Sequence, residues 1–279
     1  MAGDVRQAQP SPRKVSAPRA GRSSGSSRLT NAFAAILVGL VVLVVWQVVG
    51  SSVSPMTMSY PTAVLSEGVE LVKDGSLLSA LGSSVQSFVP AYVLAVVIGV
   101  PVGLVVGRYR LIEAGFGPYI TAGYATPLVA LIPLFIVWFG TGLLVKVAIV
   151  LTLTVFPIII NTWRGVQAVP KTLIEVGSSF GASQAEIMRK IIIPGTLPHI
   201  MTGLRLAVGR AVIGMVIAEF FTAVSGLGGI IINAGNSFDT ARMFVPVIIV
   251  LLLGIVLTWL VGLAERRLAP WHLAMSGRQ

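Results

Sequence analysis

Residues 170–199, PKTLIEVGSSFGASQAEIMRKIIIPGTLPH, decide the fold, because this stretch combines charges with helical periodicity between long apolar blocks. Pro170 suits the first turn of a helix, where its missing N–H is not needed. Leu173, Val176 and Phe180 then fall on one helix face. The pattern predicts a short amphipathic helix that lies in water between two membrane spans.

A second short helix is predicted directly after the first. Gly181 is expected to adopt a left-handed conformation that ends the first helix. Ser183 and Glu186 have the spacing of a capping box, in which each side chain accepts a hydrogen bond from a backbone amide of the other residue. Ile191 continues the apolar stripe, and Pro194 is expected to stop the helix. The prediction is therefore a helix, a glycine elbow, a second helix and a proline.

This order of residues resembles the cytoplasmic loop of binding-protein-dependent ABC importer permeases. The family pattern is Glu-Ala-Ala, three residues, Gly, nine residues, Ile, one residue, Leu-Pro. Glu175, Gly181 and Ile191 keep that spacing, with Val176-Gly177 in place of the alanines and Ile193 in place of the leucine. In that family the loop is a coupling helix that inserts into a cleft of a separate ATPase subunit. An ordinary amphipathic cytosolic connector is the alternative. The resemblance implies ATPase coupling for Glu175, Gly181, Ala182, Ser183, Glu186, Ile191 and Pro194.

Composition places the chain in a membrane. Of its 279 residues 55% are hydrophobic and 11% charged, and the mean hydropathy is +0.90, which is too apolar for a soluble core. The formal net charge of +10 is interpreted as a topology signal rather than a sign of nucleic-acid binding. The chain has no cysteine and two histidines, so we expect no catalytic residue, no metal site and no cofactor.

The expected fold is an all-α membrane protein with six transmembrane helices, a type I ABC importer permease fold and both termini in the cytoplasm. This orientation leaves 17 of the 20 basic residues on the cytoplasmic side, with only Lys73, Lys146 and Arg242 outside, as the positive-inside rule requires. The predicted segments are a disordered basic cytoplasmic tail (1–31), a first transmembrane helix (32–50), an outer connection (51–80), a five-helix core (81–264) with a cytoplasmic coupling loop (163–202), and a cytoplasmic tail (265–279).

Glycines repeat every four residues in the second predicted span. Gly99, Gly103 and Gly107 leave one helix face free of side chains, so another helix can approach closely. The partner could belong to a second copy of the chain or to the same chain, and both alternatives remain open at this point.

Two prolines fall within the third predicted span, residues 117–139. Pro127 and Pro133 interrupt backbone hydrogen bonding, which a membrane tolerates only where the freed carbonyls find partners in the bundle or in a water-filled cavity. This span is therefore a candidate wall of a translocation pathway.

The fifth predicted span, residues 203–224, carries charges. Arg205 and Arg210 are expected near its cytosolic end, while Glu219 falls sixteen residues past Gly203, about 24 Å along the helix. An intramembrane carboxylate needs a partner or water. Lys146 should lie at a similar depth, so we predict that Lys146 and Glu219 approach each other, either as part of the pathway or as an interhelical contact.

The resemblance extends over residues 77–271. Ala125-Thr126-Pro127, Trp138-Phe139-Gly140, Ala218-Glu219 and Ser225-Gly226-Leu227-Gly228 look like the nitrate, sulfonate and taurine branch of these permeases. That branch also serves pyrimidine precursors and some aromatic acids. The resemblance implies a homodimer or a pair with a related permease, two ATPase subunits, an extracytoplasmic substrate-binding protein, and a multi-pass location in a bacterial-type inner membrane, with lipid as the surroundings and no nucleic acid. The expected cargo is small and often anionic.

The energy source is expected to lie outside this chain. No G-x-x-x-x-G-K-[ST] phosphate-binding loop occurs in the sequence, so the chain itself is not expected to be an enzyme. A secondary transporter would show repeated spans with ionisable groups in both halves, and a membrane enzyme would need converging His, Asp or Ser side chains. Neither pattern is evident, and a secondary transporter or another polytopic membrane protein remains the alternative function.

Overall fold

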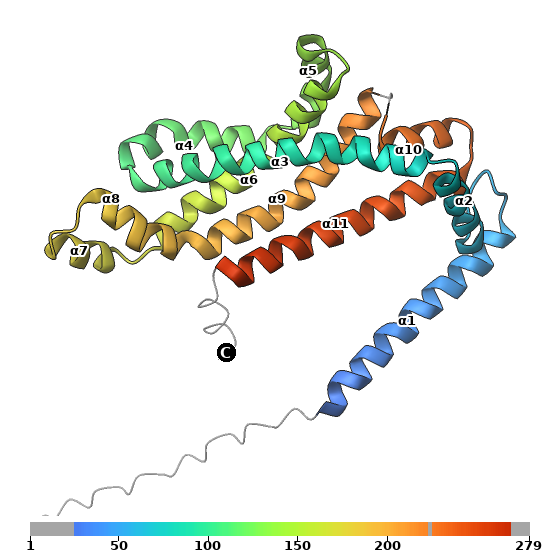
Figure 1. The fold of residues 1–279 in the computed structure, drawn as a ribbon, viewed down its shortest axis with the longest axis horizontal. Helices are drawn as coiled ribbons and strands as arrows, with labels where there is room; N and C mark the ends of the chain where they lie inside the picture. Colours follow the sequence, from blue (N-terminus) through green and yellow to red (C-terminus); the bar gives the residue numbers. More distant parts are fainter. Residues whose placement is uncertain (1–24, 223–224, 269–279) are drawn as a thin grey trace, which may run out of the picture. The chain divides into compact units, whose positions relative to one another are not determined.

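The computed structural model describes residues 25–222 and 225–268, and this part of the chain is helical, with no β-strand. Figure 1 labels the helices in chain order. Their bounds are α1 Gly25–Ser52, α2 Pro61–Lys73, α3 Ser76–Arg108, α4 Arg110–Ala125, a 3₁₀ turn Leu128–Leu131, α5 Ile132–Phe139, α6 Leu143–Ala168, α7 Lys171–Ser179, α8 Gln184–Ile187, a π-helical turn Met188–Ile192, α9 Ile193–Thr222, α10 Leu227–Asn236 and α11 Thr240–Leu268.

Two compact units make up the chain, residues 1–46 and residues 47–279. In the described part of the first unit, α1 is an unbroken helix whose apolar side chains are exposed. Five helices of the described chain are long and apolar enough to cross a membrane, and the count is six if the bent pair α4 and α5 forms one span.

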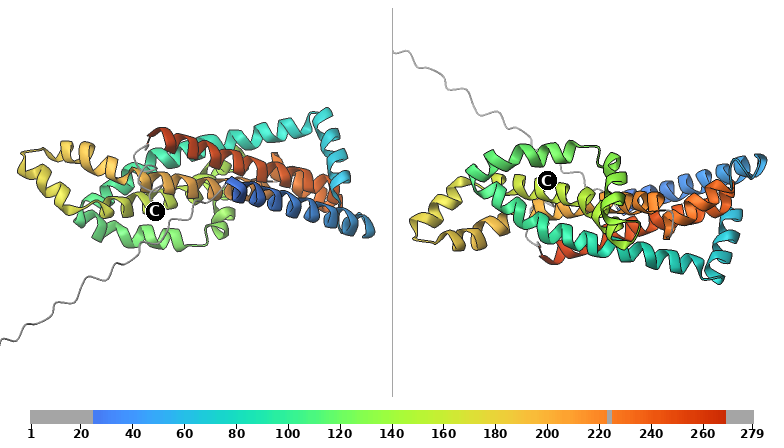
Figure 2. Two further views of the ribbon diagram at one scale, coloured as in Figure 1. Left: turned by 90° about the horizontal axis from the view of Figure 1, so that it is seen from below. Right: turned by 90° about the horizontal axis from the view of Figure 1, so that it is seen from above.

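Three long helices, α3, α6 and α9, form the centre of the second unit and lie side by side in Figures 1 and 2. Phe88, Val150, Val208 and Met215 meet in their shared core. α11 packs along α9, and both α2 and α10 contact α11. Figure 1 shows α7 and α8 at one end of this bundle, and α2 and α10 at the other end.

The glycine repeat of α3 packs against α6 within the same chain. A Cβ atom at Gly99 would lie 2.9 Å from Ile158, and one at Gly103 would lie 2.6 Å from Thr162. Gly107 is equally close to Val166. Helices in lipid gain stability mainly from such close backbone approach, so of the two alternatives the intrachain contact is the one that these glycines make.

The α4–α5 pair bends by 85°, and Pro127 stands at the bend. The backbone amide and the hydroxyl of Thr126 both donate to the Ala122 carbonyl, the last α-helical bond before the proline. The helix before the bend starts at Arg110 rather than at residue 117. Pro133 does not interrupt α5, because it lies in the first turn, where a proline costs no hydrogen bond.

Several helices extend beyond the predicted spans. α1 starts at Gly25, so residues 25–31 of the predicted tail are helical, and α3 starts at Ser76 within the predicted outer connection. Apolar content marks only the lipid core, whereas polar residues continue a helix beyond it when no Pro or Gly stops them. Residues 1–24 and 269–279, which include most of the predicted tails, lie outside the described residues.

The prediction that Pro194 stops a helix is wrong. α8 continues through the π-helical turn into α9, and the Ile193 amide donates to the Met188 carbonyl, five residues back. This widened turn comes directly before Pro194, where an ordinary α-turn would bring the proline ring against the preceding carbonyl. The result is one continuous helical rod, Gln184–Thr222.

Candidate functional site

The elbow between α7 and α8 has the geometry that its sequence predicts. Gly181 has a φ angle of +76°, which L-residues with side chains rarely adopt. Ser183 caps α8: its hydroxyl accepts from the Glu186 amide at 3.3 Å, and the Glu186 carboxylate accepts from the Ser183 amide at 3.0 Å. Lys190 donates to the same carboxylate at 3.0 Å. The capping box is therefore confirmed, and the elbow holds its shape through its own hydrogen bonds.

One side of the elbow packs against the chain. Ile187 and Ile192 are fully buried and contact Val166 of α6. At Gly177 a Cβ atom would lie 2.8 Å from Ile191, so the glycine that replaces an alanine of the family pattern lets α7 lie close to the next helix. Ile191 itself is half-buried.

The other side of the elbow presents apolar side chains to its surroundings. Leu173 is 51% exposed, Val176 52% and Phe180 87%. Glu175 is exposed as well, and it borders a cleft of about 710 Å³ that Arg108 also lines. An apolar face beside a charged cleft is the usual composition of a protein–protein contact.

At the opposite end of the bundle, Glu219 is fully buried and has hydrogen-bond partners. The Ser84 hydroxyl donates to one carboxylate oxygen at 2.6 Å, and the Gly228 amide donates to the other at 2.8 Å. The Leu227 amide in turn donates to the Ser84 hydroxyl at 3.0 Å. Gly226 has a φ angle of +93° and lies directly against the carboxylate.

Lys146 binds the same turn. Its ammonium donates to the Ser225 hydroxyl at 2.8 Å, and the Ser83 hydroxyl donates to that oxygen at 3.0 Å. The described part of the chain contains no ion pair within 4.0 Å between Lys146 and Glu219. Lys146 and Glu219 therefore bind residues of one turn without forming a direct ion pair. Sequence analysis missed Ser83 and Ser84, whose only signal is a pair of small polar residues in an apolar helix.

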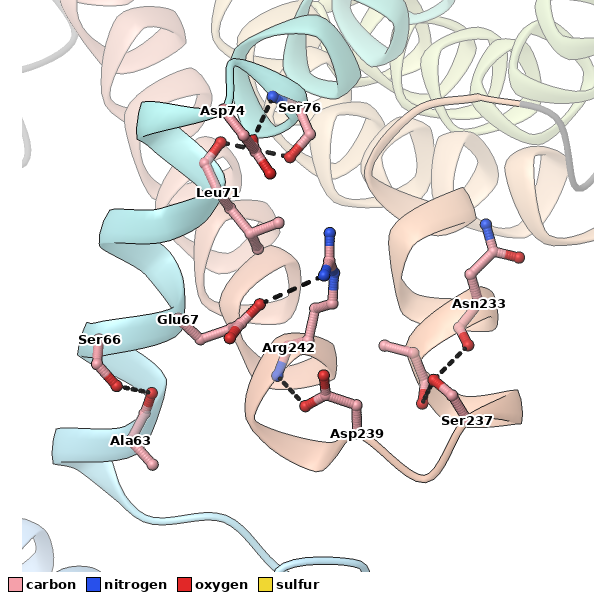
Figure 3. A network of polar contacts seen from close by, with 11 residues as sticks. Ala63, Ser66, Glu67, Leu71, Asp74, Ser76, Asn233, Ser237, Asp239 and Arg242 are labelled. Carbon is pink, nitrogen blue, oxygen red and sulfur yellow. Dashed lines mark hydrogen bonds and ion pairs between the residues drawn. The ribbon is translucent and has the colours of Figure 1, made fainter.

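A second polar cluster lies near this end, between α2 and α11 (Figure 3). Glu67 lies 3.6 Å from Arg242, and the Arg242 amide donates to the Asp239 carboxylate at 3.0 Å. Burial raises the pKa of Glu67 above its usual value, and the nearby Asp239 carboxylate adds to the effect. A cavity of about 290 Å³ lies beside Asp239 and Asn233.

Arg210 is exposed on α9, and its guanidinium lies 5.8 Å from the centre of the Tyr124 ring of α4. Arg205 instead forms an ion pair with Glu265 of α11 at 2.5 Å. The two arginines, both expected near the cytosolic end of the span, thus face different neighbours.

Solved structures share the fold. In the inward-facing methionine ABC transporter MetNI, one chain matches 69% of this chain and 96% of its own length, with a TM-score of 0.55 and 20% identity. An amino acid ABC transporter crystallised with histidines matches 71% of this chain and 97% of its own, with a TM-score of 0.50 and 23% identity.

Relatives of similar length are permeases. The taurine transport system permease TauC of Escherichia coli is 30% identical over 239 residues, 83% of this chain and 87% of TauC. The putative aliphatic sulfonates transport permease SsuC of Bacillus subtilis is 29% identical over 244 residues, 87% of this chain and 88% of that protein. These likenesses do not support the alternatives of a secondary transporter or a membrane enzyme.

A family model described as binding-protein-dependent transport system inner membrane component matches residues 95–270. This range contains the elbow, the glycine repeat of α3, the α4–α5 bend and Glu219. The chain therefore belongs to the binding-protein-dependent transport system inner membrane component family, and it is a permease subunit of an ABC importer.

Proposed function

We propose that two copies of this chain, or one copy and a related permease, form the pathway of an importer in a bacterial-type cytoplasmic membrane. Two separate ATPase subunits bind the elbow from the cytoplasm, and a soluble substrate-binding protein delivers cargo to the opposite end. ATP hydrolysis belongs to the ATPase subunits. The family of the chain supports this assembly, since its description names a binding protein.

The single observation that carries the coupling role is the exposed apolar face of the elbow. Phe180 is 87% exposed although it stands beside a turn fixed by a capping box. A rigid turn that holds an aromatic side chain outward is suited to a pocket on a partner, because little conformational freedom is lost on binding.

The continuous helix that follows the elbow offers a route for coupling. Residues Gln184–Thr222 form one helical segment of 39 residues, roughly 58 Å long at 1.5 Å per residue. Its first turn is in the elbow, and its last turn carries Glu219. A displacement that the ATPase imposes at the elbow is therefore transmitted to the outer end along one continuous helix. For ATP to switch the bundle between an inward-open and an outward-open arrangement, the ATPase must contact the two arrangements differently.

The proposed cargo is a small anionic nutrient of the aliphatic sulfonate class. Two of the most similar relatives are named for aliphatic sulfonates and for taurine. Relatives named for formylaminopyrimidine and riboflavin cover smaller parts of the chain, 58% in each case.

The test uses the complete complex in proteoliposomes, with ATP enclosed and the binding protein outside. Glu175→Lys should assemble in the membrane and lose ATP-dependent, vanadate-sensitive uptake, because it reverses a charge at the coupling face. Glu70→Lys is the matched control, since Glu70 is exposed on α2 at the other end of the bundle. The Glu70→Lys complex should still retain the ATPase subunits on purification.

Gly181→Val tests the shape of the elbow separately from its charge. A β-branched residue resists a φ angle of +76°, so the elbow should change its course and the ATPase should be lost. If either Glu175→Lys or Gly181→Val imports ethanesulfonate at the unmodified rate, the coupling role of the elbow is refuted.

A further inference from the structure

A groove on the second unit brings two arginines together from different helices. It lies between α4, α6 and α9, has a volume of about 410 Å³, and is lined by Tyr124, Asn161, Trp163, Arg164, Leu206 and Arg210 among others. Sequence analysis singled out Arg210 but gave Arg164 no role in the pathway, because the two residues are 46 positions apart in the chain.

The positive charge of this groove is not neutralised within the described chain. No described carboxylate forms an ion pair within 4.0 Å with Arg164 or Arg210. Glu113 of α4 accepts a hydrogen bond at 2.6 Å from Gln167, another residue that lines the groove. Arg210 rests on the Tyr124 ring, a contact that orients the guanidinium without cancelling its charge.

The contacts between α6 and α9 place the two arginines at different depths. The helices run antiparallel, and Gly203 of α9 lies against Asn161 of α6. Arg210 stands seven residues beyond Gly203, away from the elbow, and Arg164 stands three residues from Asn161, toward the elbow. Their Cα atoms are thus roughly 15 Å apart along the bundle. Together they form a positive track that leads toward the elbow end.

The surroundings of Arg210 indicate water. Arg210 is exposed in the single chain, although it lies within a helix that is long and apolar enough to cross a membrane. A charged side chain within a span faces a bundle interior or a water-filled cavity, or reaches the headgroup region when it lies near the helix end, rather than facing lipid tails. The face of α9 that carries Arg210 is therefore assigned to an aqueous path.

The groove also contains an unused hydrogen-bond donor. The indole Nε1–H of Trp163 is buried and has no acceptor among the described residues. A buried donor without a partner is costly, but this nitrogen has no exposed surface, so an anion in the groove would reach it only if the indole ring turned.

We propose that this groove binds the negatively charged group of the cargo, a sulfonate or carboxylate, inside the membrane. Arg210 receives the anion first and Arg164 receives it nearer the cytoplasm. The assignment of cargo class rests on the proposed function, but the groove as an anion site can be tested without transport.

The test exploits the absence of cysteine from the natural sequence. Leu206→Cys places one thiol in the groove, where Leu206 is 56% exposed. The probes are two membrane-impermeant methanethiosulfonates that differ in charge, the sulfonatoethyl reagent (negative) and the trimethylammonioethyl reagent (positive). Each is applied to right-side-out and inside-out vesicles that contain the complete complex without ATP. Ser79→Cys, exposed on α3 away from the elbow, gives the reference ratio of the two rates.

The negative reagent should react with Leu206→Cys about tenfold faster, relative to the positive reagent, than it does with Ser79→Cys, as expected for nearby unit charges in a wet groove. Arg210→Gln and Arg164→Gln should each reduce this preference several-fold, and free ethanesulfonate should slow the reaction. Arg205→Gln is the matched control, because Arg205 lies on the same helix but pairs with Glu265, and it should leave the preference unchanged.

Three results would overturn the anion site: no reaction of Leu206→Cys from either side, a rate ratio equal to that of Ser79→Cys, or a ratio unaffected by Arg210→Gln and Arg164→Gln. Uptake is measured separately. If the complex imports riboflavin and not ethanesulfonate, the proposed cargo is wrong, while the labelling ratios still decide whether the groove attracts anions.

Discussion

The two ends of the helix that runs from α8 through α9 differ in how their polar and apolar groups are satisfied. At the outer end, Glu219 is fully buried and accepts hydrogen bonds from Ser84 and Gly228. At the elbow end, Phe180 and Val176 are exposed and have no core to enter within the described chain.

The difference indicates that the outer end supports the fold of the chain itself, whereas the elbow end is available to a partner. Losing either donor to the buried Glu219 carboxylate should destabilise the fold, because one carboxylate oxygen is then buried without its hydrogen bond. An exposed apolar face contributes little to the stability of its own chain and becomes useful only when a partner covers it. We therefore expect substitutions at the outer turn to change folding and substitutions at the elbow to change assembly.

The largest loss of stability is expected for Gly226→Ala. Its Cβ atom would lie 2.1 Å from the Glu219 carboxylate, and the residue has a φ angle of +93°. Strained backbone and overpacking together should lower the free energy of unfolding by about 3 kcal/mol or more. The measurement is thermal unfolding of the purified permease in detergent.

Gly229→Ala is the control for this substitution. Gly229 is in the first turn of α10, three residues after Gly226, and a Cβ atom there would meet nothing within 4 Å. Alanine at this position should leave stability unchanged or raise it by up to about 1 kcal/mol through helix propensity. Equal losses for both variants would mean that the turn does not depend on its contact with Glu219.

A smaller loss of stability is expected for Ser84→Ala. The change leaves one Glu219 oxygen and the Leu227 amide without their partner, which costs about 1–3 kcal/mol for buried groups. Ser79→Ala, an exposed position on the same helix, should have no measurable effect. Unchanged melting of the Ser84 variant would show that water or another group replaces the hydroxyl.

The sequence predicts these two ends unequally well, for a physical reason. The elbow follows local rules: a proline start, a left-handed glycine and a capping box all act within a few residues of one another. The outer turn depends on Ser84, which is 143 residues from Leu227, and no local pattern links them. Sequence analysis therefore located Glu219, Lys146 and the turn of residues 225–228, but not Ser83 and Ser84, which complete the connection.

Helix ends and interruptions are also hard to predict from local sequence patterns. The periodicity of apolar residues indicates most of the spans, but it does not reveal that the π-helical turn carries the chain past Pro194 or that Pro133 starts a helix. These outcomes depend on backbone hydrogen bonds that neighbouring turns rearrange. Arg164 and Arg210 could not be paired from the sequence either, because only the antiparallel packing of α6 on α9 brings them to one groove.

At the elbow, Ser183→Ala should have a modest and local effect. The capping box is exposed, so its loss should cost about 1 kcal/mol in the first turn of α8. Hydrogen exchange of the amides of Ser183 and Glu186 should accelerate while the melting temperature stays nearly constant. Faster exchange throughout α9 would indicate that the elbow and the membrane helix unfold together.

Phe180→Ala should have the smallest effect on stability and a large effect on assembly. With 87% of Phe180 exposed, its removal should change the free energy of unfolding by less than about 0.5 kcal/mol. If Phe180 fills a pocket on the ATPase, truncation should weaken that contact by about 2 kcal/mol, roughly 30-fold in affinity. Phe238→Ala is the matched control, because Phe238 is also exposed but lies between α10 and α11 at the other end of the bundle. Loss of ATPase binding in the Phe180 variant alone would assign the contact to the elbow, whereas equal binding by both variants would exclude this aromatic side chain from the interface.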